Sequence, residues 1–145
     1  MAKGLAGSDF GAIGAGTVKY AVVKLRTKYG KQNVAVVENT GVDYSCTENR
    51  LYVKHKGKVY YYGSKGIDGI LKAVSKDRKY FYTYMGISYG AEIYKYNQKK
   101  GKYVLLKSDT TGSESATNKI VNEAKKKYGC VVPVKEKSWK YVKAK

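Results

Sequence analysis

Hydrophobic and polar residues alternate in the first part of the chain, and this alternation predicts β-strands. In residues 17–27, Val18, Tyr20 and Val22 fall on one face of an extended chain, and the residues between them fall on the other. Residues 34–38 form a second run that is rich in β-branched valine. A short polar segment with a glycine separates the two runs, so we expect them to pair as a hairpin.

A pattern of tyrosine and lysine occurs twice in the middle of the chain. Residues 51–62 and residues 93–106 each place strand-like residues on both sides of a short stretch rich in lysine and glycine. This arrangement is typical of a β-hairpin. Residues 51–106 hold most of the 16 tyrosines, so the aromatic side chains are concentrated in and between the two predicted hairpins.

One segment between these hairpins has the spacing of a helix. In residues 67–74, the apolar residues Ile67, Ile70, Leu71 and Val74 recur at intervals of three and four. Such a stripe predicts a short amphipathic helix with one buried face.

A second helix is predicted near the C-terminus, beginning after Ser113 and ending at Gly129. Ser113 suits an N-cap, and Glu114 suits the first turn of a helix. A run of lysines followed by glycine is typical of a helix end. We expect this helix to bury the side chains of Thr117, Ile120, Val121, Ala124 and Tyr128.

Three more strands complete the predicted elements. Residues 79–85 alternate tyrosine on one face with other large side chains on the opposite face. Residues 130–134 contain a proline, which favours an edge strand because proline has no amide to donate. Residues 138–142 form a last short strand.

The order of the predicted elements indicates the fold class. A hairpin, a helix and a strand follow one another in residues 51–85 and again in residues 93–134. One interpretation is a duplicated ββαβ unit, and the alternative is a chance recurrence of common hairpins. Either way the elements predict an α+β fold, with two helices packed on one face of an antiparallel β-sheet. Residues 17–145 are expected to form a single domain, since 43% of the chain's 145 residues are hydrophobic.

The positive charge of the chain indicates the kind of partner that it binds. The chain has 29 lysines and arginines against 11 acidic residues, which gives a formal net charge of +18. Such an excess indicates contact with a polyanion, of which nucleic acid is the usual example. The alternative is a lysine-rich composition that keeps a tyrosine-rich surface soluble. If the charge is functional, the predicted polyanion contacts are the hairpin lysines Lys54, Lys56, Lys58, Lys95, Lys99, Lys100 and Lys102.

The tyrosines allow two interpretations. Alternate tyrosines on a sheet form either a core layer or a recognition surface, because the ring offers a large apolar face and a hydroxyl. We expect about half of them to pack inside and the rest to face a partner. The predicted aromatic interface comprises Tyr60, Tyr62, Tyr80, Tyr82, Tyr84, Tyr94 and Tyr96.

The N-terminal residues 1–16 are rich in glycine and alanine and form a predicted extended arm. Its anchors are Leu5, Phe10 and Ile13. Glycine loses much entropy on ordering, so we expect the arm to become ordered only against a neighbouring subunit. We read no secretory signal in it, and no run of about 18 apolar residues predicts a membrane span.

Candidate catalytic residues are sparse. His55, the single histidine, lies between two lysines, and the acidic residues form no compact metal-binding motif. We therefore expect no enzyme activity, no metal and no cofactor; a small hydrolase or nuclease using His55 or Glu123 is the less favoured alternative. Cys46 and Cys130 form one disulfide, a bond between subunits, or two buried thiols.

These observations favour a non-enzymatic structural protein that works in an assembly, most simply as a capsid-associated component of a viral or phage particle. Its partners would be copies of itself or other particle proteins, and it would be found in the virion or the cytoplasm. The alternative is a sheet-based protein that binds nucleic acid without sequence preference through lysines and stacked tyrosines.

Overall fold

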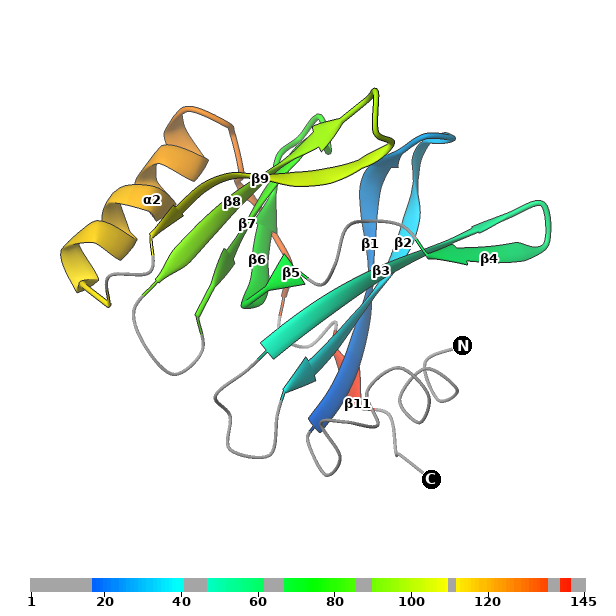
Figure 1. Ribbon diagram of the computed structural model, residues 1–145, viewed down its shortest axis with the longest axis horizontal. Helices are drawn as coiled ribbons and strands as arrows, with labels where there is room; N and C mark the ends of the chain where they lie inside the picture. The colour runs from blue at the N-terminus through cyan, green and yellow to red at the C-terminus, as the bar shows by residue number, and fades with distance from the viewer. Residues whose placement is uncertain are drawn as a thin grey trace.

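The computed structural model describes residues 17–40, 47–61, 67–85, 90–109, 112–135 and 139–141 (Figure 1). These residues form two antiparallel β-sheets and one helix. Sheet A contains, in spatial order, β11 (Lys140–Tyr141), β1 (Thr17–Thr27), β2 (Gly30–Thr40), β3 (Thr47–His55) and β4 (Lys58–Tyr61), with β5 (Ile67–Asp68) paired to β3. Sheet B contains β10 (Val132–Pro133), β6 (Ile70–Val74), β7 (Tyr80–Tyr84), β8 (Ala91–Asn97) and β9 (Lys102–Asp109).

The predicted α+β class, with two helices on one face of a sheet, is wrong. The chain is mostly β, and the described residues contain a single helix, α2 (Glu114–Lys126). The segment 67–74, predicted as a helix, forms β5 and β6 instead. Without that helix there is no duplicated ββαβ unit, so this part of the prediction is also wrong.

The cause of the error lies in two local distortions of the segment 67–74. Gly69 has a φ of 84°, which allows the chain to leave sheet A after β5 and enter sheet B as β6. In β6 the register with β7 shifts between Leu71 and Ala73, which indicates a β-bulge at Lys72. The extra residue brings Leu71 and Val74 into the same core. A bulged strand therefore shows the spacing of three that is typical of a helix.

Several other elements are confirmed. The hairpins β1–β2, β3–β4 and β8–β9 form as antiparallel pairs. Helix α2 begins after Ser113, whose hydroxyl accepts a hydrogen bond from the amide of Ala116 at 3.3 Å. Pro133 lies in β10, which is an edge strand of sheet B.

Two of the three hydrophobic clusters in the described residues define the layers of the protein. The main core lies between the sheets, where Leu25, Val36 and Leu51 of sheet A meet Phe81 and Tyr103 of sheet B. On the outer face of sheet B, α2 packs over β7, β8 and β9, as Figure 1 shows. The buried residues of this second core comprise Ala73, Tyr82, Ala91, Ile93, Ile120, Ala124 and Cys130.

Candidate polyanion-binding site

Three turns come together at one end of the two sheets, at the top of the view in Figure 1. They connect β1 to β2, β6 to β7, and β8 to β9. The amide of Arg26 donates to the carbonyl of Arg78 at 3.0 Å, which joins β1 to the β6–β7 turn. The buried Tyr103 hydroxyl accepts from the amide of Arg26 at 3.2 Å and donates to the Arg78 carbonyl. These bonds fix the turns of both sheets next to each other.

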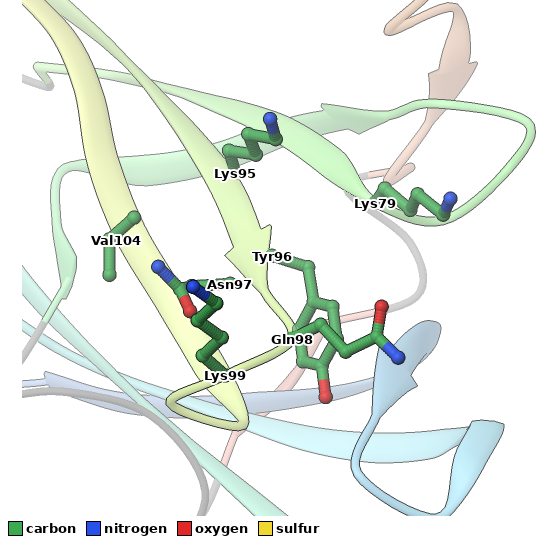
Figure 2. A pocket seen from close by; sticks show the side chains of 7 residues that line it. All are labelled: Lys79, Lys95, Tyr96, Asn97, Gln98, Lys99 and Val104. Atoms are coloured by element: carbon green, nitrogen blue, oxygen red, sulfur yellow. The ribbon is translucent and has the colours of Figure 1, made fainter.

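A groove runs over this end of the molecule, and we call it the basic groove. It consists of two hollows that share the side chains of Lys79, Tyr96 and Gln98. The first hollow, shown in Figure 2, is also lined by Lys95, Asn97, Lys99 and Val104. The second is also lined by Arg26, Thr27, Lys28 and Gly30. Because the hollows share three residues, they adjoin each other, and together they extend from sheet B to the β1–β2 turn.

The groove is strongly cationic. Five basic side chains line it, and none of the lining residues is acidic. In Figure 2 the side chains of Lys79 and Lys95 extend away from the strands. Amide groups of Asn97 and Gln98 add hydrogen-bond donors between the charges. A hollow with one sign of charge concentrates counter-ions, so this arrangement suits a chain of phosphates.

The turn that supplies Lys79 is organised by Asp77. The amide of Lys79 donates to the Asp77 carboxylate at 3.0 Å, and the Ser75 hydroxyl donates to the same oxygen. Burial opposes ionisation, but these hydrogen bonds and the charges of Lys79 and Lys31 hold the pKa of Asp77 below its ordinary value. Asp77 therefore carries a charge at neutral pH and shapes the turn beside the groove.

Aromatic rings continue the basic groove beyond Lys28. The rings of Tyr29 and His55 are stacked, with centroids 3.7 Å apart and planes 3° from parallel. The Tyr60 ring is tilted by 51° to the Tyr29 ring, with the two centroids 6.1 Å apart. The Lys28 Nζ lies 5.2 Å from the Tyr29 centroid and 5.8 Å from the Tyr60 centroid. We call Tyr29, His55 and Tyr60 the aromatic cluster.

The two predicted lysine groups lie on different hairpins, and only members of the second group line the basic groove. Lys54, Lys56 and Lys58 are exposed on the β3–β4 hairpin, whose rings reach Lys28. Lys28 also lies beside Gly101 of the β8–β9 turn, where a Cβ would be 3.5 Å from the Cβ of Lys28. Of the second predicted group, Lys95 and Lys99 line the groove, Lys100 is exposed in the turn and Lys102 is half-buried on β9.

Sequence reasoning missed Arg26, Lys28 and Lys79 as groove residues. Lys28 lies in the turn of the first hairpin, and Lys79 lies just before β7. Their positions at turns were readable from the sequence. Their proximity was not, because it depends on how sheet A packs against sheet B.

The predicted tyrosine interface is divided by the packing. Tyr82, Tyr94 and Tyr96 are buried in the cores, although the edge of Tyr96 also lines the groove. Tyr80 and Tyr84 are half-buried, and Tyr60 is exposed. Tyr62 and the arm residues Leu5, Phe10 and Ile13 lie outside the described residues.

One buried acidic residue is paired with a tyrosine inside the main core. Glu92 is 6% exposed, and its Oε1 accepts a hydrogen bond of 2.9 Å from the Tyr94 hydroxyl. Burial, followed by the nearby charge of Glu92, raises the pKa of Tyr94, so the hydroxyl keeps its proton and remains a donor. The Tyr94 hydroxyl therefore supplies a hydrogen-bond donor to the buried carboxyl group of Glu92.

The other candidate chemical groups are separated from one another. His55 stacks on Tyr29, and Glu123 forms an ion pair of 2.7 Å with Lys107. In the described ranges, no group of three or more His, Cys, Asp or Glu side chains is placed to hold a metal ion. Cys130 is a free buried thiol, and burial together with the charge of Asp77 raises its pKa to about 12. Cys46 lies outside the described residues.

The described part of the chain has no helix that is long and apolar enough to cross a membrane. No protein family model matches the chain, and neither a curated protein nor a solved structure matches it.

Proposed function

We propose that this protein binds the phosphate backbone of nucleic acid in the basic groove, without sequence preference. The observation that carries the proposal is the convergence of five basic side chains and no acidic one along a single groove. Four of the five are lysines, which attract phosphate but do not offer the forked geometry by which arginine reads guanine. The net charge of +18 adds long-range attraction for any polyanion.

The salt dependence of binding tests the proposal. If all five cations contact phosphates of a single strand, the slope of log K against log salt should be about −3.5. The variant with Lys28→Gln, Lys95→Gln and Lys99→Gln should reduce the slope by about 2, because three contacts are lost. Fluorescence anisotropy with a labelled oligonucleotide at several salt concentrations measures both slopes.

A charge-matched control separates the groove from net charge. The variant with Lys119→Gln, Lys125→Gln and Lys126→Gln removes three exposed lysines from α2, which lies on the outer face of sheet B. Its slope should stay close to that of the unmodified protein. Equal slopes for the two triple variants would show that binding follows total charge and would reject the groove.

A second candidate is the assembly role, with copies of this chain as partners in a larger particle such as a virion. Two unpaired sheet edges favour it: in the described part of the chain, no strand pairs with the outer side of β4 or β9. These edges expose large apolar side chains, namely Val59, Tyr60, Tyr61, Leu105 and Leu106. Exposed edges with apolar side chains are templates for adding a strand from another copy.

Light scattering tests the assembly role. The charge of +18 opposes self-association, so we expect particle mass to rise when salt or an oligonucleotide screens that charge. Leu105→Glu should suppress the rise, whereas Val131→Glu, at an exposed position before β10 and away from β4 and β9, should not. A constant monomer mass under all these conditions would reject assembly through the edges.

A further inference from the structure

We infer that the aromatic cluster is a base-stacking site at the end of the basic groove, and that the nucleic acid it accepts is single-stranded. This inference rests on the proposed function and goes beyond it, because the groove alone attracts any polyanion. The additional claim concerns the rings of Tyr29, His55 and Tyr60.

The first step is continuity between the phosphate contacts and the rings. Lys28 lines the basic groove, and its Nζ lies within 6 Å of the centroids of both Tyr29 and Tyr60. A phosphate held by Lys28 would therefore place its own nucleotide next to these rings. The cation and the aromatic face are the two components of sequence-tolerant binding of single strands.

The second step is that the rings are both supported and accessible. Tyr29 packs against the main core, and His55 lies parallel to it at stacking distance. Tyr60 is 37% exposed, and the four residues of β4 are all exposed. A base can thus reach a ring that belongs to a supported cluster, and little freedom is lost on binding.

The third step concerns the form of the nucleic acid. In a duplex the faces of the bases are covered by their neighbours, so a side chain reads only base edges in the grooves. Stacking on a tyrosine requires a base that is turned out of such a stack. The aromatic cluster therefore favours a single strand over the same strand in a duplex.

The test compares ligands with and without bases. The probes are a labelled 12-residue oligothymidylate, the same strand in a duplex, and inorganic polyphosphate of similar length, all measured at low salt. We expect the single strand to bind more tightly than the duplex. Tyr60→Ala should weaken binding of the single strand by about 5- to 150-fold, the range for loss of one stacked base. Its binding of polyphosphate should not change.

Two control variants make the result specific. Tyr60→Phe keeps the ring and should retain single-strand affinity. Tyr141→Ala removes an exposed tyrosine on β11 and should have no effect. Circular dichroism of each variant confirms that the fold is kept, as expected for exposed positions.

The outcomes separate this inference from the proposed function. The stacking site is rejected, while the groove stands, if the duplex and the single strand bind with equal affinity. It is also rejected if Tyr60→Ala leaves the affinity for the single strand and for polyphosphate unchanged, or lowers both equally. If neither the strand nor polyphosphate binds at low salt, the proposed function fails, and the stacking site fails with it.

Discussion

The two tyrosine- and lysine-rich hairpins look alike in sequence and differ in burial. In β8–β9, Tyr94, Tyr96 and Tyr103 are at most 8% exposed. In β3–β4, Tyr52 of β3 is buried, but Tyr60 and Tyr61 of β4 are 37% and 47% exposed. Both β4 and β9 are outer strands, but the tyrosines of β8–β9 lie on the face that packs against sheet A in the main core, whereas β4 extends away from sheet B in Figure 1.

This difference shows that packing between the two sheets, rather than local pattern, decides what a tyrosine does. The covered rings hold the two sheets together, and removing one opens a cavity. The uncovered rings contribute little to the core, so they can contact another molecule without loss of the fold. The comparison predicts unequal costs for the same substitution in the two hairpins.

The largest expected effect is the loss of a ring from the covered hairpin. Tyr103→Ala should lower the free energy of unfolding by about 3–5 kcal/mol, because a fully buried ring leaves a cavity. Its hydroxyl also links Arg26 to Arg78 across the sheets. Tyr61→Ala, the matched change in the uncovered hairpin, should cost about 1 kcal/mol or less, since the Tyr61 ring is 47% exposed and packs edge-on against Tyr52. Urea denaturation measures both, and similar losses would contradict the comparison.

The strands and α2 were predictable because local chemistry agrees with the final packing. Residues 17–27 alternate along their whole length, and no bulge interrupts their pairing with β2. Ser113 caps α2 through a local hydrogen bond to the first turn, so the start of this helix does not depend on distant contacts. Residues 67–74 failed because their conformation depends on partners: β3 holds β5, while β7 and β10 hold β6. A periodicity of three cannot distinguish a helix from a strand with a bulge.

The candidate site was predictable only in part, for a similar reason. Lys95 and Lys99 lie beside a turn that the sequence marks clearly, and turns are exposed. The groove also needs Lys28 and Lys79, which come from other turns and meet only when the sheets pack. The burial of Tyr94 follows from the same contact between layers.

A smaller effect is expected when only a hydroxyl is removed. Tyr94→Phe should cost about 1.5–3 kcal/mol, because the buried Glu92 carboxyl loses its 2.9 Å hydrogen bond while the ring still fills its space. Tyr60→Phe, the same change in the uncovered hairpin, should leave stability unchanged, since the exposed hydroxyl of Tyr60 faces water in the folded and in the unfolded protein. Urea denaturation at neutral pH compares the two variants, and a Tyr94→Phe protein as stable as the Tyr60→Phe protein would show that the buried hydroxyl carries no special weight.

The smallest effect concerns the helix that covers the β8–β9 hairpin. The hydrogen bond from Lys107 and the charges of Lys107, Lys127 and Lys119 outweigh desolvation and lower the pKa of Glu123 from its ordinary value of 4.5. A carboxyl with a lowered pKa stabilises the fold above its ordinary pKa, and this contribution is lost as the pH falls through the lowered value. Glu123→Gln should therefore reduce the urea midpoint slightly at pH 7 and low salt, and the difference should disappear at acid pH and in high salt, because the pair is exposed.

Lys107→Gln should reproduce the loss, whereas Lys58→Gln on the uncovered hairpin should not. A difference that persists when Glu123 is protonated would mean that the side chain acts through packing rather than through its charge.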